Sequence, residues 1–249
     1  PLTAPRNRFH HLDLNNTDGY LRWQEAKLAA YPRRLEDLVV EIGDPYRLTP
    51  AEYKAMAECI RRANMVIYVG PPGMDRDVVT ALGRRFGLQR IDRNWLADDD
   101  GLTPLSVAAD GTRSAYIPYT DRAISWHTDG YYNAPERQIR GLLLHCVRPA
   151  AVGGDNGLLD PELVYILLRN INPDYIRALM APDVLTIPAG TQEGGAHRPA
   201  RSGPVFSIDP VTGALHMRYT ARRRNAVWKD DGLVQEARTC LESILEGEQ

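Results

Sequence analysis

The sequence predicts an α+β fold, in which a helix-containing N-terminal part precedes a β-sandwich or barrel. Strong helix signals lie mainly before residue 88, whereas the remainder alternates short β-type runs with Gly, Pro and Asp turns. The chain has 249 residues, of which 43% are hydrophobic and 25% charged. These proportions are typical of a globular protein and exclude collagen-like, coiled-coil and wholly disordered chains.

The N-terminal part carries the clearest local signals. Thr49 and Glu52 form a capping box, and Pro50 suits the first position of the helix that follows. Asp75 is placed to cap a later helix that stops at Gly87. In order, the expected elements are an irregular lead over 1–19, a helix over 20–30, a strand over 35–42, a helix from 50 to about 63, a buried strand over 65–69 and a helix from 75 to 86.

Beyond residue 88, β-type runs predominate. The DPVTG turn at 209–213 lies between two such runs and indicates a hairpin. Asp160 and Pro161 provide a cap and a first helical position for one of the few helices in this part. The expected strands are 105–110, 114–119, 139–147, 183–189, 204–209 and 214–220, and the expected helices are 160–169, 173–180 and 233–245.

Charge and composition limit the partners that the chain is expected to have. The net charge of −2 lacks the basic excess of a nucleic-acid-binding protein. No apolar run approaches the roughly 18 residues that a membrane-spanning helix needs, and the N-terminal residues lack the apolar region of a signal peptide. Cys59, Cys146 and Cys240 are far apart, which fits a reducing compartment. We therefore expect a cytoplasmic protein without nucleic-acid or membrane partners, and leave a homo-oligomer open.

The most informative motif is the H-x-D triplet of His127, Thr128 and Asp129. On an extended segment, side chains alternate, so His127 and Asp129 lie on the same face. One imidazole and one carboxylate supply two members of the 2-His-1-carboxylate triad that holds non-haem Fe(II). Taken alone, the triplet is also compatible with a surface histidine beside a turn-forming Asp-Gly.

Three segments carry a resemblance to a known family. They are WHTDGYY at 126–132, RGLLLHCVRPA at 140–150 and GGDNGLLDPELVYILL at 153–168. Together they resemble the TauD/TfdA family of Fe(II)- and 2-oxoglutarate-dependent dioxygenases, in which a strand and a Gly-Gly-Asp-type turn follow the H-x-D motif. The likeness extends over residues 35–249 and leaves 1–34 as an irregular or helical lead.

This resemblance implies a double-stranded β-helix, or jelly-roll, with flanking N-terminal helices. It implies that His127 and Asp129 are iron ligands, and that Asn156 stands where many members have a threonine that contacts 2-oxoglutarate. The implied activity is the oxidation of a C–H bond of a small-molecule substrate by O2, with release of succinate and CO2. The aromatic side chains of Trp126, Tyr131 and Tyr132 line the substrate pocket or belong to the core.

The pattern departs from the family in its last part. Members carry a second iron-binding histidine and an arginine for 2-oxoglutarate, and in this chain we expect the corresponding strands beyond Gln249. The alternative is that the chain is a divergent member with an incomplete triad. Among the histidines of this chain, His216 is the best surrogate, though a weak one, because it shares a strand face with Arg218. His145 is better explained as a core residue and His197 as a loop residue. An arginine-rich stretch around the same hairpin is either an anion site or a solvated face, and it comprises Arg198, Arg201, Arg218 and Arg222 to Arg224.

Two other functions remain open. The first is that of a catalytically inactive jelly-roll that binds a small ligand or a protein partner. The second is that of a cupin-like metalloenzyme that uses another oxidant. In the last case His216 would complete the metal site.

Overall fold

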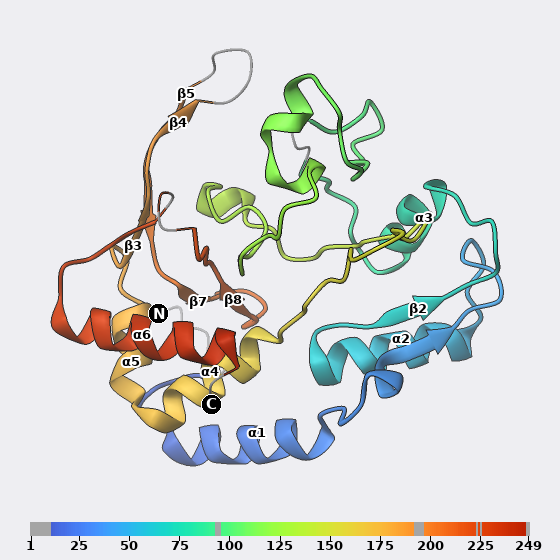
Figure 1. Cartoon of the computed structure of the whole chain (residues 1–249). Helices are drawn as coiled ribbons and strands as arrows, with labels where there is room; N and C mark the ends of the chain where they lie inside the picture. The colour runs from blue at the N-terminus through green and yellow to red at the C-terminus, as the bar shows by residue number, and fades with distance from the viewer. Residues whose placement is uncertain (1–10, 93–95, 192–196, 223, 225, 248–249) are drawn as a thin grey trace, which may run out of the picture. The chain divides into compact units, whose positions relative to one another are not determined.

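The computed structural model of the protein describes residues 11–92, 96–191, 197–222, 224 and 226–247 (Figure 1). The chain forms two compact units. Unit 1 comprises residues 1–89, 143–170 and 208–215, and unit 2 comprises 90–142, 171–207 and 216–249.

Unit 1 contains four α-helices and a short parallel strand pair among its described residues. They are α1 (Thr17–Ala30), the 3-10 helix η1 (Leu35–Leu38), β1 (Val39–Glu41), α2 (Pro50–Ala63), β2 (Ile67–Val69), α3 (Asp77–Arg85) and α4 (Pro161–Ile171), whose last residue passes into unit 2. β1 and β2 are parallel, with Val39 opposite Ile67. Apolar side chains of α2 and α3 pack together, and the buried cluster consists of Ile42, Met56, Val78 and Leu82. Burial of these side chains holds the helices on the strand pair.

Helix α2 begins at the predicted capping box. The Thr49 hydroxyl accepts a hydrogen bond from the Glu52 amide at 3.3 Å, and the Glu52 carboxylate accepts one from the Thr49 amide at 2.6 Å. The same carboxylate also accepts the Gly43 amide at 2.7 Å. Two orphan amides of the first turn are thereby satisfied, which fixes where the helix starts. Asn64 ends it in the left-handed region, with φ of 55°.

A buried ion pair connects the helices of unit 1. Asp160, the residue before α4, is fully buried, and its carboxylate lies 2.7 Å from the ammonium of Lys27 on α1. The carboxylate also accepts hydrogen bonds from the Asn64 amide side chain at 2.8 Å and from the Glu162 backbone amide at 2.9 Å. Asp160 therefore caps α4 and joins it to the C-terminal end of α2 and to α1.

Unit 2 contains short antiparallel strands and two packed helices. In chain order they are η2 (Thr112–Ala115), η3 (Ile117–Tyr119), η4 (Pro135–Arg137), α5 (Pro173–Leu179), β3 (Leu185–Ile187), β4 (Gly190–Thr191), β5 (His197–Arg198), β6 (Arg201–Gly203), β9 (Val227–Trp228) and α6 (Gly232–Glu246). β3 is the centre of a three-stranded sheet in the order β6-β3-β9, and β4 pairs with β5. α5 packs against α6. The strands β7 (Phe206–Ile208) and β8 (Leu215–Met217) form a hairpin through which the boundary between the two units passes.

The predicted helices and the hairpin are confirmed. The hairpin turns at DPVTG because the Asp209 carboxylate accepts the amides of Val211 and Thr212, at 2.9 and 2.6 Å. Asp231 caps α6 by accepting the Val234 amide at 3.1 Å. The helix expected from Asp75 begins slightly later, at Asp77, whose amide Asp75 accepts at 3.1 Å.

Several predicted strands are wrong. Segments 105–110 and 139–147 are not strands, 114–119 forms the 3-10 helices η2 and η3, and 35–42 opens with η1. In 139–147 the side chains of Leu142 and Val147 are 57% and 66% exposed. A β-type run becomes a strand only where another backbone edge pairs with it, and alternation in the sequence does not supply that edge.

The α+β class is confirmed in its coarse form, since helices and small sheets both occur. Within the described ranges the strands form sheets of only two or three members, and they do not close into a barrel. No helix in these ranges is both long and apolar enough to cross a membrane. Cys59, Cys146 and Cys240 are free thiols.

The Asp160 ion pair gives a stability prediction. Asp160→Asn leaves Lys27 buried with only the partly exposed Glu162 carboxylate as an anionic neighbour, at 2.5 Å. We expect a loss of about 3 kcal/mol in the free energy of unfolding of unit 1, measured by urea denaturation. Glu58→Gln, on α2 of the same unit, is the control, because its ion pair with Arg61 is exposed and its loss should be much smaller. Equal losses in the two variants would contradict the structural role of Asp160.

Candidate functional site

The H-x-D segment is hydrogen-bonded to residues 219–221 of the same unit. The two segments form an antiparallel bridge between His127 and Thr220. The connecting hydrogen bonds are Thr128 N to Tyr219 O at 3.0 Å, Tyr219 N to the Thr128 hydroxyl at 3.0 Å and Ala221 N to Trp126 O at 2.9 Å. The bridge ends where Asp129 enters a turn, and the side chains of residues 127 and 129 nevertheless meet on one side of the segment.

His127 and Asp129 are brought together as predicted. The Nε2 atom of His127 lies 3.4 Å from Oδ1 of Asp129, and the two side chains are 34% and 45% exposed. On the other side of the ring, Nδ1 lies 2.9 Å from the Ser125 carbonyl oxygen. A carbonyl only accepts hydrogen bonds, so Nδ1 carries the hydrogen and Nε2 is the nitrogen that faces the carboxylate.

The electrostatics of the pair follow from these contacts. The Asp129 carboxylate is the main cause that raises the pKa of His127, and the Ser125 carbonyl adds to it. Partial burial and the charge of Arg222 act in the opposite direction. His127 is thus a histidine whose second nitrogen is oriented by a backbone acceptor, an arrangement usual for metal-binding histidines.

The chain turns immediately after Asp129. Gly130 has a φ of 65°, and a Cβ atom there would come within 2.5 Å of the Ile139 side chain. Asn133 closes the turn by donating its amide to the Gly130 carbonyl at 2.8 Å. The Asn133 side chain donates to Asp92 at 2.9 Å, and Arg137 also binds Asp92. The segment therefore contains both features expected from the sequence: a turn at Asp129-Gly130, and the pairing of His127 with Asp129.

Aromatic side chains flank the pair in different environments. Trp126 is 36% exposed. The rings of Tyr131 and Tyr132 meet edge to face with centroids 5.1 Å apart, and both residues are half-buried. The guanidinium of Arg198 lies 5.6 Å from the centroid of the Tyr132 ring. Burial is the main cause that raises the pKa of Tyr132.

Arg218 has a structural role that the sequence did not reveal. It is only 8% exposed, and its guanidinium donates hydrogen bonds to backbone carbonyls alone among the described contacts. These acceptors are Tyr131 O at 2.8 Å, Leu185 O at 3.0 Å, Arg201 O at 2.9 Å and Gly203 O at 3.3 Å. The interpretation of Arg218 as part of an anion site is therefore wrong, because its donors are already used. Its position in an apolar strand, between Met217 and Tyr219, is the signal that indicates burial.

His216 is not grouped with the H-x-D pair. It is half-buried on β8, and burial, followed by the charges of Arg140 and Arg218, lowers its pKa to about 4. In the part of the chain that the structure describes, no cluster of three His, Cys, Asp or Glu side chains is arranged to hold a metal ion. A site completed by His216 is accordingly not supported.

The other predicted positions lie elsewhere. Asn156 belongs to unit 1, is exposed, and donates from its side chain to the Gly154 carbonyl at 3.3 Å. Gly153 and Gly154 have φ of 69° and 82°, which glycine adopts readily, and the segment is irregular. His145 is satisfied by the Tyr68 hydroxyl at 2.8 Å, as expected of a packed histidine. The loop position expected for His197 is wrong, because His197 lies exposed on β5, which pairs with β4.

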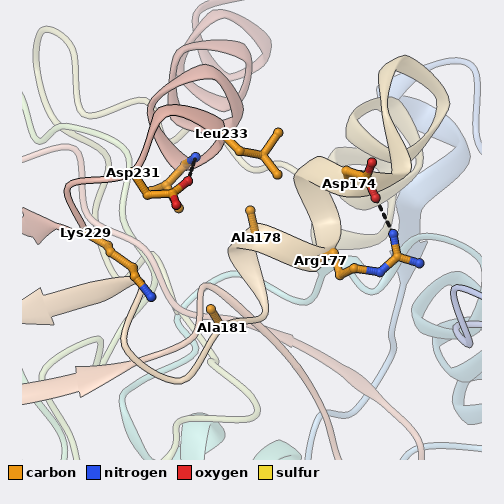
Figure 2. A pocket seen from close by; sticks show the side chains of 8 residues that line it. Asp174, Arg177, Ala178, Ala181, Lys229, Asp231 and Leu233 are labelled. Atoms are coloured by element: carbon orange, nitrogen blue, oxygen red, sulfur yellow. Dashed lines mark hydrogen bonds and ion pairs between the residues drawn. The ribbon is translucent and has the colours of Figure 1, made fainter.

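A shallow hollow of about 250 Å³ lies between α5 and the start of α6 (Figure 2). Its charged groups are already paired: Arg177 binds Asp174, Lys229 lies 2.8 Å from Asp183, and Asp231 caps α6. None of the candidate residues lines it. The lining residues are Asp174, Arg177, Ala178, Ala181, Lys229, Asp231, Leu233 and Val234.

The chain is similar to known proteins over most of its length. A family model described as "Taurine catabolism dioxygenase TauD, TfdA family" matches residues 27–249. The chain is 35% identical to a uridine-5'-phosphate dioxygenase of Amycolatopsis sp over 99 residues, which cover 38% of this chain and 33% of that protein. It is 31% identical to a uridine-5'-phosphate dioxygenase of Streptomyces sp over 144 residues, covering 56% and 49%. The chain thus spans between a third and a half of these curated relatives, and no solved structure matches it significantly.

Burial of His216 makes stability depend on pH. Its pKa in the folded protein, about 4, is below the ordinary 6.5, so between these values the unfolded chain takes up a proton that the folded chain does not. Stability is therefore complete above pH 6.5 and falls as the pH drops toward 4, by up to about 3 kcal/mol. His216→Gln should remove this part of the pH dependence, measured by urea denaturation across the range. His197→Gln, which removes an exposed histidine, is the control, and identical pH profiles for His216→Gln and wild type would refute the interpretation.

The Arg218 contacts lead to a second prediction. Arg218→Lys keeps the charge but cannot reach four carbonyls with one ammonium, so buried acceptors lose their partners. We expect the free energy of unfolding to fall by about 2 kcal/mol or more, read from denaturant midpoints. Arg222→Lys, on an exposed residue of the same segment, should change it by less than about 0.5 kcal/mol. A small effect at Arg218 would mean that the carbonyls find other donors.

Proposed function

The chain belongs to the taurine catabolism dioxygenase TauD, TfdA family, and from this membership we propose that it is an Fe(II)- and 2-oxoglutarate-dependent dioxygenase. The proposed reaction oxidises a C–H bond of a small-molecule substrate with O2 and releases succinate and CO2. The jelly-roll fold of the family is proposed for the complete domain.

One observation carries the assignment to this chain. His127 presents Nε2 toward Asp129 at 3.4 Å, while its Nδ1 donates to the Ser125 carbonyl. This leaves an imidazole nitrogen and a carboxylate oxygen side by side and partly open to solvent, as the first two ligands of a facial triad require. A bound Fe(II) would supply the redox chemistry that couples oxidation of 2-oxoglutarate to oxidation of the substrate.

The residues of the chain have distinct proposed roles. His127 and Asp129 would hold the metal, and the pairing of their segment with 219–221 keeps both donors on one side. Ser125 would orient the imidazole through its carbonyl. Asn156 is proposed as a contact to 2-oxoglutarate, to which its amide can donate. We assign only these two protein ligands, because within the described residues no third His, Cys, Asp or Glu side chain joins them.

The names of the relatives guide the choice of substrate. Both act on uridine-5'-phosphate according to their names, and this nucleotide is therefore the first substrate to assay. A phosphorylated small molecule is the substrate class that we propose.

The metal assignment is tested by anaerobic equilibrium dialysis with Fe(II) and 2-oxoglutarate, with iron measured by elemental analysis. We expect His127→Ala and Asp129→Ala to weaken iron binding at least about tenfold, since each removes one of few ligands. His197→Ala, on the exposed strand β5, should bind iron as wild type does. Circular dichroism of each variant checks that the fold is kept.

The catalytic part of the proposal has its own readout. Succinate formed from 2-oxoglutarate in the presence of uridine-5'-phosphate should require iron and both His127 and Asp129. If wild type binds neither iron nor 2-oxoglutarate, the alternative of an inactive ligand-binding protein is favoured. If the variants bind iron as tightly as wild type, the pair is not the metal site.

A further inference from the structure

Arg198 is an arginine whose hydrogen bonding is incomplete. It lies on β5, opposite Gly190 of β4. Its Nη2 donates to the Pro188 carbonyl at 2.8 Å, while its Nη1 is shielded from solvent and has no hydrogen-bond partner. In the described part of the chain no ion pair neutralises it either. A buried cationic donor without an acceptor is unfavourable, and such a group in a folded protein indicates that an acceptor is supplied from elsewhere.

The local structure holds the guanidinium in place. A Cβ atom at position 190 would lie 3.0 Å from Nη2, so the glycine leaves the space that the guanidinium occupies. On its other side the Tyr132 ring lies 5.6 Å away, a cation–π distance. Arg198 as a whole is only partly buried. A planar guanidinium held in this way matches the geometry of a phosphate or carboxylate.

Tyr132 connects Arg198 with the candidate metal ligands. It lies in the tight turn that starts at Gly130, directly after Asp129, and Asn133 closes that turn at 2.8 Å. The charges of Asp129 and Arg198 act on the pKa of Tyr132 in opposite directions, which is consistent with both groups lying near its ring. An anion bound at Arg198 would therefore lie close to the H-x-D segment.

We propose that Arg198, supported by the Tyr132 ring, is an anion subsite that binds the phosphate group of a phosphorylated small-molecule substrate. The inference rests on the proposed function, because it names the part of the substrate that is held beside the metal ligands. A phosphate is chosen over the carboxylate of 2-oxoglutarate because both relatives are named for a phosphorylated substrate.

The subsite is tested by isothermal titration calorimetry on the full chain, without metal, using uridine-5'-phosphate, uridine and 2-oxoglutarate as probes. Wild type should bind the nucleotide more tightly than the nucleoside. Arg198→Gln should weaken nucleotide binding about 10- to 100-fold, and Arg198→Lys about tenfold, because lysine keeps the charge but loses the planar fork. Uridine binding should not change. Arg177→Gln, on an exposed arginine of α5, is the matched control and should leave all affinities unchanged.

Two variants of Tyr132 test whether its ring supports anion binding by Arg198. Tyr132→Phe keeps the ring and should bind the nucleotide as wild type does, whereas Tyr132→Leu should weaken binding about threefold or more. Thermal unfolding of each variant confirms that it is folded at the temperature of titration.

The outcomes separate this inference from the proposed function. The subsite is refuted if Arg198→Gln binds the nucleotide as wild type does, if nucleotide and nucleoside bind equally, or if only 2-oxoglutarate binding falls. None of these results bears on iron binding by His127 and Asp129. Conversely, nucleotide binding that depends on Arg198 in a chain that binds no iron would keep the subsite and overturn the dioxygenase.

Discussion

The arrangement of unit 2 depends on one buried cation. The Arg218 guanidinium has no carboxylate partner among its contacts, and backbone carbonyls from three other segments take the place of water around it. Burial lowers the pKa of Arg218, yet the carbonyl dipoles keep a charged group tolerable inside the protein. Because one planar group reaches β3, β6 and the turn after the H-x-D motif, these segments cannot shift independently.

This constraint reaches the candidate metal ligands through the backbone. Arg218 donates a hydrogen bond to the carbonyl of Tyr131, which lies two residues after Asp129. The residue after Arg218, Tyr219, donates its backbone amide to the Thr128 hydroxyl. Hydrogen bonds therefore hold the backbone on both sides of Asp129, at Thr128 and at Tyr131, before any ligand binds. A site whose donors are held by backbone pairing needs little rearrangement to accept a metal, and its two side chains stay open to solvent.

Unit 1 also contains a buried charged side chain, in this case a carboxylate. There Asp160 is fully buried, and it is compensated by Lys27 together with two amide donors. The carboxylate caps α4 and at the same time joins it to two other helices. In both units a buried charge is surrounded by groups from distant parts of the chain, and removing either charge leaves its partners unsatisfied.

Features that depend on residues close together in the chain could be predicted from the sequence. The capping box at Thr49 and Glu52, the DPVTG hairpin and the common face of His127 and Asp129 involve neighbours within a few residues, and the structure shows all three. Family membership was also accessible, because it rests on motif residues. The proximity of His127 and Asp129 was thus predicted without knowledge of the fold.

The tertiary structure alone decided which β-type runs found a partner edge, so 139–147 stayed unpaired although its pattern matched that of true strands. It also decided the roles of the arginines. Arg218 and Arg198 look alike in the sequence, but one is saturated by carbonyls and the other has a nitrogen without an acceptor. The physical reason is the same in both cases: a hydrogen-bond partner that lies far away in the chain is supplied by folding, and no local pattern encodes it.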